Sequence, residues 1–262
     1  MALKHRAYPS CMATLPGYAQ LTFPDAPEGR PYVLVNMVMS GDGKIVIEGT
    51  EQGLGSSSDQ ALMGQLRSHA DAVLNGAETL RKSGSSPLPA SEEMRALREY
   101  RGLPRAPLGV VLSRSGDLPL DGEFFTSPAF ESVVFLADSA HDDRRRAVEA
   151  TGRRVVSVPV GDSVRAMLRA LRVDFGVRVL LCEGGAALNG ALFDADAVDE
   201  YFVTVGARIV GGDVALTPVR GDRAPSSALV RPLTLVSAVT NPETSEVYLR
   251  YRVGTTQGRT SS

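Results

Sequence analysis

Continuous apolar runs alternate with amphipathic stretches along most of this 262-residue chain. Runs of this kind predict strands that are buried on both faces. Apolar residues at helical spacing predict the helices between them, the first of which has Ser58 or Asp59 as its expected N-cap. The predicted strands are 31–40, 70–75, 108–112, 132–136, 154–158 and 177–182, and the predicted helices are 58–69, 77–82, 94–100, 142–151, 164–173 and one that follows Gly185. This alternation predicts a mostly parallel sheet with right-handed crossovers.

The C-terminal pattern differs, because the apolar segments at 201–205, 233–239 and 246–253 follow one another without helices. Residues 246–253 alternate apolar and polar positions, which predicts a strand that pairs antiparallel at an edge of the sheet. We therefore expect one α/β domain over residues 30–253 with an antiparallel C-terminal edge. Residues 1–29 are predicted to be an irregular arm and 254–262 a flexible tail.

Composition excludes several classes of protein. The 28 basic and 30 acidic residues give a net charge of −2, which argues against a nucleic-acid-binding surface. The two cysteines, Cys11 and Cys182, make a disulfide framework improbable and favour a reducing cytoplasm. The chain has no basic-then-apolar leader and no apolar run of about 18 residues, so we expect neither secretion nor a membrane span.

Four predicted strands end in polar or glycine-rich tips: Met39-Ser40, Gly76 to Thr79, Ser113-Arg114, and Glu183-Gly184-Gly185. In an open α/β sheet, ligands bind beyond the carboxyl ends of the strands. The Gly-Gly pair precedes a helix, so it allows a close backbone approach and offers free N–H groups to an anion. A tight turn without a ligand explains any one of these tips equally well. The four together favour a nucleotide site.

The type of nucleotide follows from the third tip. Ser113 and Arg114 suit a 2′-phosphate, because a guanidinium is a planar, permanently charged fork and the hydroxyl adds a donor. NADP is therefore favoured over NAD, and Thr79 at the start of a short helix is a candidate for the pyrophosphate. The G-x-G-x-x-G fingerprint follows none of these strands, which disfavours a Rossmann domain.

Several segments resemble, in order, the motifs of the riboflavin-pathway pyrimidine reductases. Residues 36–45 (NMVMSGDGKI) resemble their "xMSLDGKI" opening, and residues 66–80 resemble "LRaxaDAvlvGaxTl". Residues 111–114 and 183–188 match the next two blocks, and Asp199-Glu200 with Gly211-Gly212 resembles the closing "vDElxlxxxPxxxGG". The resemblance spans roughly Arg30 to Val253. It implies a dihydrofolate-reductase-like fold, NADPH as cofactor, a small-molecule substrate and a homodimer whose interface uses the apolar late strands.

The resemblance also implies roles for particular residues. It places Lys44, Arg67 and Glu183 at the substrate, with Arg67 on a ribose 5-phosphate and Glu183 on exocyclic nitrogens or ribitol hydroxyls. Lys44 and Glu183 are the candidate proton donors. The implied cofactor contacts are Met39 at the nicotinamide, Thr79 at the phosphates, Ser113 and Arg114 at the 2′-phosphate, and Gly184, Gly185, Ala186 and Leu188 around the pyrophosphate.

The reaction implied by the resemblance is reduction of a phosphoribosylamino pyrimidine, of the 5-amino-6-(5-phosphoribosylamino)uracil type, to its ribitylamino form. The sequence lacks the H-x-E and P-C-x-x-C signatures of zinc deaminases, so we expect reduction alone and no metal site. Three departures lie on the substrate side: Ser83 replaces an acid, residues 49–55 lack an aromatic, and Thr204 replaces a proline. They leave two alternatives open: a reductase of another small imine or carbonyl, such as dihydrofolate, and a non-catalytic NADPH-binding protein.

Overall fold

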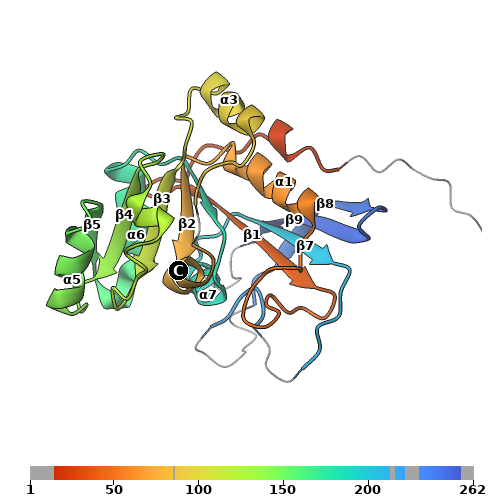
Figure 1. Ribbon diagram of the computed structural model, residues 1–262. Helices are drawn as coiled ribbons and strands as arrows, with labels where there is room; N and C mark the ends of the chain where they lie inside the picture. The colour runs from red at the N-terminus through yellow and green to blue at the C-terminus, as the bar shows by residue number, and fades with distance from the viewer. Residues whose placement is uncertain (1–14, 85, 213–215, 222–229, 255–262) are drawn as a thin grey trace, which may run out of the picture.

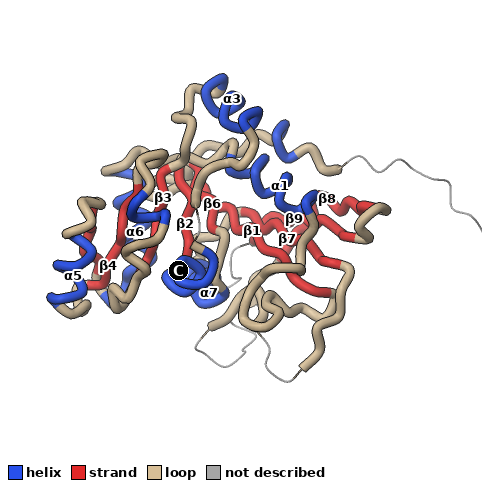
Figure 2. The backbone as a smooth tube through the Cα atoms, in the orientation of Figure 1, coloured by secondary structure: helices blue, strands red, loops and turns tan. Residues whose placement is uncertain are grey.

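A nine-stranded sheet forms the centre of the computed structural model, which describes residues 15–84, 86–212, 216–221 and 230–254 (Figures 1 and 2). The strand order is β5-β4-β3-β2-β6-β1-β7-β9-β8. The seven strands from β5 to β7 pair in parallel, whereas β9 pairs antiparallel with both β7 and β8. The strands are β1 (Tyr32–Ser40), β2 (Ala72–Gly76), β3 (Leu108–Ser113), β4 (Ser132–Ala137), β5 (Arg154–Val158), β6 (Val179–Cys182), β7 (Glu200–Gly206), β8 (Leu233–Asn241) and β9 (Glu246–Val253).

Helices cover both faces of the parallel part of the sheet. The helices α6 and α7 pack one face through an apolar cluster that includes Leu74 of β2. The other face is covered by α1 near the middle of the sheet, and by α2, α4 and α5 toward β4. The α-helices are α1 (Ser57–Arg67), α2 (Ala77–Ser83), α3 (Glu92–Tyr100), α4 (Glu123–Thr126), α5 (Asp142–Glu149), α6 (Ser163–Val173) and α7 (Ala186–Asp194). None of the helices in the described residues is long and apolar enough to cross a membrane.

The predicted fold class is confirmed, with three differences in detail. The strand β9 is not at the edge; it lies between β7 and β8, and β8 is the edge strand. The short helix α4 was not expected, because four residues are too few to display a helical period. The N-cap of α1 is Ser56, whose hydroxyl accepts from the N–H of Ser58, so the prediction of Ser58 or Asp59 was wrong by two or three residues.

Part of the predicted N-terminal arm belongs to the core. Residues Tyr18–Gln20 form a short 3-10 helix, η1, and the Tyr18 ring packs edge-on against Phe202 at 5.1 Å between centroids. Tyr18 is buried, and His69 Nε2 lies 2.8 Å from its carbonyl oxygen. Pro, Gly and Ala gave this segment no period, so its packing was not visible in the sequence. The predicted residues 1–14 of the arm and 255–262 of the tail lie outside the described residues.

Candidate active site

A cavity of about 720 Å³ opens at the carboxyl ends of the four neighbouring strands β3, β2, β6 and β1. Its walls come from the ends of these strands, from the first residues of α2 and α7, from one side of α1, and from the segment 45–55. The four strand tips singled out in the sequence therefore lie on one rim of the sheet. The parallel pairing of these strands brings their carboxyl ends together, as the alternation of strands and helices predicted.

The Gly-Gly turn packs directly against the start of α2. The N–H of Gly76 donates to the carbonyl oxygen of Gly184 at 2.7 Å. A Cβ on Gly76 would lie 3.1 Å from the backbone nitrogen of Gly185, and a Cβ on Gly185 would lie 3.1 Å from Thr79 Oγ1. Gly184 has a φ of +88°, a backbone conformation that would be strained in a residue with a side chain. Gly76 and Gly185 thus form a corner of the cavity that is lined by backbone, and we call it the Gly-Gly corner. The N-terminus of α7 follows it directly and also lines the cavity.

The end of β3 supplies one buried hydroxyl and one exposed cation. Ser113 is buried, and its Oγ accepts a hydrogen bond from the N–H of Gly116 at 3.0 Å. Arg114 is exposed, and both residues line the cavity. Two further cations line the cavity: Lys82, which pairs with Glu78 on α2, and Arg220, whose backbone N–H donates to the carbonyl oxygen of Ala186 at the start of α7. This distribution of charge suits the phosphates of a dinucleotide.

The other end of the cavity is bounded by one stripe of α1. Asp59, Met63 and Arg67 are spaced four residues apart, so they lie on one side of the helix and line the cavity. Leu62 and Leu66 are buried against the sheet instead. The alternation of cavity-facing and core-facing residues in this helix determines which α1 side chains a ligand can reach.

Arg67 and Glu183 form a bidentate ion pair at the end of this stripe. Arg67 Nε donates to Glu183 Oε1 and Nη2 donates to Oε2, both at 2.7 Å. The two side chains are 11% and 8% exposed. Although burial opposes it, the Glu183 carboxylate raises the pKa of Arg67 above its usual value. The two residues predicted to hold different parts of the substrate therefore bind each other.

The C-terminal end of α1 is held by Arg98 of α3 and by Arg101, the residue that follows α3. Arg98 is fully buried, and its Nη1 donates at 2.6 Å to the carbonyl oxygens of both Arg67 and Ala70. Arg101 Nη1 donates to Ser68 Oγ at 2.6 Å. Burial lowers the pKa of Arg98 to about 10, but it remains a cation at neutral pH. The position of the Arg67 backbone thus depends on contacts with α3, a separate helix (Figure 1).

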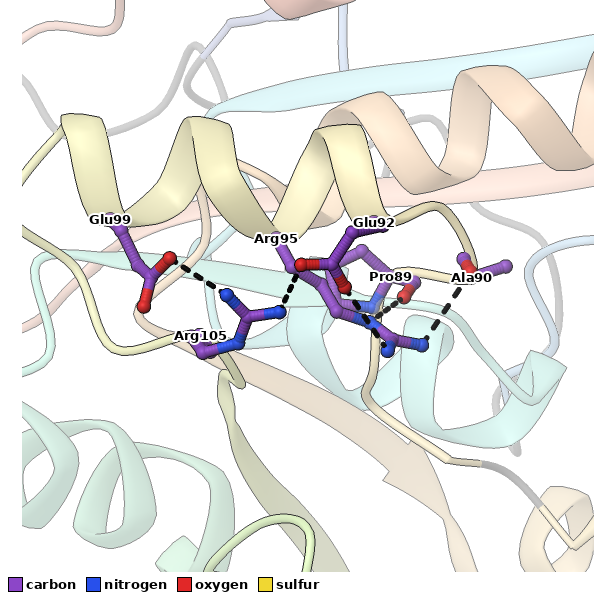
Figure 3. A network of polar contacts seen from close by, with 6 residues as sticks. All are labelled: Pro89, Ala90, Glu92, Arg95, Glu99 and Arg105. Atoms are coloured by element: carbon purple, nitrogen blue, oxygen red, sulfur yellow. Dashed lines mark hydrogen bonds and ion pairs between the residues drawn. The ribbon is translucent and has the colours of Figure 1, made fainter.

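The segment before α3 is held from two sides. Arg67 Nη1 donates to the carbonyl oxygen of Leu88 at 2.7 Å. Arg95 Nε donates to the carbonyl oxygen of Pro89 at 2.9 Å and pairs with Glu92 (Figure 3). Figure 3 also shows Arg105 bridging Glu92 and Glu99 of α3. Ala90, in the same segment, lines the cavity, so this network determines the position of one wall.

Asp59 lies at the N-terminal end of the α1 stripe, eight residues before Arg67, and also lines the cavity. Burial raises the pKa of Asp59 to about 6, a hydrogen bond with Thr204 of β7 opposes this rise, and the nearby Glu246 adds to it. Glu246 accepts hydrogen bonds from Ser56 Oγ at 2.7 Å and from the Tyr248 hydroxyl at 2.6 Å. A carboxyl that titrates near neutrality in a cavity can give up a proton during a reaction.

The structure brings most of the predicted site residues together. Those that line the cavity are Arg67, Thr79, Ser113, Arg114, Glu183, Gly185, Ala186 and Leu188. Three do not line it: Met39, Lys44 and Gly184. Met37 and Val38 line the cavity in place of Met39, and Ile45 and Val46 do so in place of Lys44. A Cβ on Gly184 would meet the sulfur of Met37 at 3.0 Å.

Asp59 and Asn75 are polar cavity residues that the sequence analysis did not predict. Asp59 was considered only as an N-cap, although its spacing of four from Met63 and eight from Arg67 could have placed it on the ligand side of the helix. Asn75 was read only as part of an apolar strand, yet it lines the cavity. A polar residue at the end of an otherwise apolar strand was the available signal.

Comparison with solved structures identifies the fold. The fold matches that of a pyrimidine reductase-like protein from Corynebacterium diphtheriae with a TM-score of 0.75 at 22% identity, covering 85% of this chain and 92% of that one. It also matches the deaminase/5-amino-6-(5-phosphoribosylamino)uracil reductase of Thermotoga maritima, with a TM-score of 0.61 at 21% identity, covering 86% of this chain and 57% of that one. The protein thus has the α/β fold of these pyrimidine reductase structures.

Sequence comparison identifies the family. The RibD C-terminal domain family matches residues 31–242. A 2,5-diamino-6-ribosylamino-4(3H)-pyrimidinone 5′-phosphate reductase from Archaeoglobus fulgidus is 31% identical over 198 residues, covering 74% of this chain and 88% of the relative. The chain belongs to the RibD C-terminal domain family, the NAD(P)H-dependent pyrimidine reductases of riboflavin biosynthesis.

Proposed function

We propose that this protein is an NADPH-dependent reductase that converts a phosphoribosylamino pyrimidine to its ribitylamino form. The observation that carries the proposal is the single cavity that joins the glycine-lined, cationic end to the α1 end with its titratable acid. One end has the character of a dinucleotide site and the other that of a small-substrate site. Family membership supplies the reaction class.

The residues at the first end fit NADPH. The corner formed by Gly76 and Gly185 keeps side chains away from the path of a pyrophosphate, and a Cβ at either glycine would press on a neighbour at 3.1 Å. The N-terminus of α7, with Ala186 and Leu188, would hold the phosphates, and Arg114 would bind the 2′-phosphate. When bound, NADPH supplies the hydride.

The substrate end would position the ring-opened imine of the substrate and supply a proton. Addition of a hydride to the imine carbon places a pair of electrons on the nitrogen, which then takes up one proton. Asp59 is the group that we assign to this step, because its pKa of about 6 lets it carry a proton near neutral pH. Lys44, the earlier candidate, does not line the cavity, and Glu183 is committed to Arg67.

Arg67 can still contact a substrate phosphate, but only through the N–H groups that do not bind Glu183 or Leu88. A guanidinium has five N–H groups, and three of those of Arg67 are used by Glu183 and the Leu88 carbonyl. Among the residues that the structure describes, none accepts from the remaining two, one on Nη1 and one on Nη2, so these can donate to a ligand. The carboxylate of Glu183 likewise retains acceptor capacity for an exocyclic nitrogen.

A turnover assay tests the proposal. The purified protein is mixed with NADPH and either 2,5-diamino-6-ribosylamino-4(3H)-pyrimidinone 5′-phosphate or 5-amino-6-(5-phosphoribosylamino)uracil. We expect NADPH oxidation with at least one of them and a ribitylamino product by mass spectrometry. Saturable NADPH binding without turnover of either compound would instead favour a non-catalytic binding protein.

A second candidate function is reduction of another small imine or carbonyl that carries no phosphate. The observation that favours it is the Arg67–Glu183 pair, which neutralises the cation that a phosphate would need. Dihydrofolate and the dephosphorylated pyrimidine are the compounds to compare with the two phosphates. Faster turnover of a compound without phosphate would place this candidate first.

We also propose that the protein forms a homodimer through its exposed edge strand. Leu233, Leu235 and Val236 of β8 are 44%, 54% and 42% exposed, and such an edge can pair with a second copy. Sedimentation of the wild-type protein should give the mass of two chains, and Leu235→Asp should give one. A wild-type protein that sediments as a monomer at all concentrations would refute this interface.

A further inference from the structure

Asn75 carries a buried oxygen atom that is left without a hydrogen bond. Asn75 is the second-last residue of β2; it is 3% exposed and lines the cavity. Of the residues that the structure describes, none donates to its Oδ1 atom. Most buried side-chain oxygens in proteins have a partner, because leaving one unpaired costs the loss of its hydration. This position therefore requires an explanation that the fold does not supply.

The register of the strands places Asn75 at the substrate end. Cys182 of β6 pairs with Leu74 of β2 and with Val35 of β1, so the next residues, Asn75, Glu183 and Asn36, form one row across three strands. All three line the cavity. Side chains alternate along a strand, and Val73 packs in the cluster under α1, so Asn75 lies on the α1 side of the sheet.

Two members of the row, Asn75 through Oδ1 and Glu183 through its carboxylate, are hydrogen-bond acceptors. The carboxylate of Glu183, next to Asn75, is held by Arg67 but accepts only two hydrogen bonds from it. Together with Asn75 Oδ1, it forms an edge that suits a ligand with N–H donors. In the pyrimidine reductase motif "LRaxaDAvlvGaxTl" the position of Asn75 is occupied by valine, so the acceptor is a feature of this chain.

We propose that Asn75 is a specificity-determining residue whose Oδ1 accepts a hydrogen bond from an amino group on the pyrimidine ring of the substrate. This inference rests on the proposed function and refines its substrate. The two candidate substrates differ in the ring: the diamino-pyrimidinone has an amino group where the uracil has a carbonyl oxygen. A carbonyl oxygen facing Oδ1 would bring two acceptors together, so Asn75 selects the diamino-pyrimidinone.

The test compares the wild-type protein with Asn75→Val, which restores the residue type of the motif. We expect the wild-type enzyme to prefer the diamino-pyrimidinone phosphate over the uracil by roughly 10- to 100-fold in kcat/KM, the usual range for one such hydrogen bond. Asn75→Val should reduce this ratio to near one and leave the Kd for NADPH unchanged. Calorimetry with each pyrimidine should show the same change in the ratio of their Kd values.

Two results would overturn the inference: an unchanged ratio in Asn75→Val, or a weakened Kd for NADPH in place of a changed preference. Turnover by the wild-type enzyme is scored separately, so failure of the proposed function is distinguishable from failure of the role of Asn75.

Asn189→Val is the matched control for stability. Asn189 is also buried, but its amide donates to the Pro218 carbonyl at 2.8 Å and its Oδ1 accepts from Cys182. We expect Asn189→Val to lower Tm and Asn75→Val to leave it unchanged or raise it; a large loss of Tm in Asn75→Val would show that its amide is a structural group.

Discussion

Replacing Asp59 by Asn should make the protein more stable and less active, and both effects should depend on pH. The pKa of Asp59 is raised from 3.8 to about 6, mainly by burial. A raised pKa means that the folded state favours the protonated form, so this contribution to stability is complete below about pH 4 and is lost as the pH rises through 6. Asn cannot ionise, so Asp59→Asn avoids that loss.

The size of the effect follows from the shift. Two pKa units correspond to about 3 kcal/mol, and partial exposure of Asp59 reduces this to about 2–3 kcal/mol at pH 8. For a domain of this size that is a rise in Tm of roughly 5–10 °C. At pH 4, where Asp59 of the folded protein is protonated and as uncharged as Asn, the two proteins should unfold at nearly the same temperature. Thermal unfolding followed by circular dichroism between pH 4 and pH 8 measures the difference.

The effect on activity has the opposite sign. If Asp59 gives the proton, kcat/KM of the wild-type enzyme falls as the pH rises through about 6, and Asp59→Asn loses roughly 10²- to 10⁴-fold in rate together with this pH dependence. Glu93→Gln makes the same carboxyl-to-amide change in the first turn of α3, where the side chain is exposed, and should alter neither property. An Asp59→Asn enzyme with the wild-type rate and pH profile would refute the assignment.

Three further predictions concern the cofactor and the ion pair. Arg114→Ala should weaken NADPH binding by about 1.5–3 kcal/mol with little effect on NADH, and equal affinities of the unmodified protein for the two cofactors in a fluorescence titration would contradict the 2′-phosphate assignment. Gly185→Val should abolish NADPH binding in a folded protein, because its Cβ would lie 3.1 Å from Thr79 Oγ1 and its methyl groups would extend into the corner; unchanged affinity by calorimetry would exclude this corner. Arg67→Ala should raise KM for the phosphorylated pyrimidine with NADPH affinity unchanged, and should lower stability by about 3–5 kcal/mol because Glu183 is left buried and unpaired; unaltered kinetics would remove Arg67 from the substrate site.

The sequence was sufficient to predict the sheet and the location of the cavity. Period and apolar runs are local signals, and parallel strands joined by helices bring their carboxyl ends together whatever their order. That is why Thr79, Arg114 and Gly185 could be placed at one rim before their contacts were known. The predicted edge strand was wrong, because period alone does not reveal that β8 pairs outside β9.

The chemistry of individual residues was harder to predict, because it depends on partners that are distant in the chain. Arg67 and Glu183 are 116 positions apart, so the sequence could not show that they neutralise each other. The pKa of Asp59 depends on burial, Thr204 and Glu246, which come from other elements. Lys44 belongs to a motif that the sequence matches well, yet its neighbours Ile45 and Val46 line the cavity instead.

The hydrogen bonds between Ser56 and Glu246 link the beginning of α1 to a strand near the end of the chain. Glu246 Oε1 accepts from the Ser56 N–H and Oε2 from the Ser56 hydroxyl, both at 2.7 Å, across 190 positions of sequence. During synthesis on the ribosome, the first turn of α1 emerges long before this partner exists. Its N-terminal cap is therefore completed only when β9 has been translated and has joined β7. Asp59, whose surroundings include Glu246, can reach them only after residue 246 has been synthesised, so a nascent chain that ends before β9 has no finished active site.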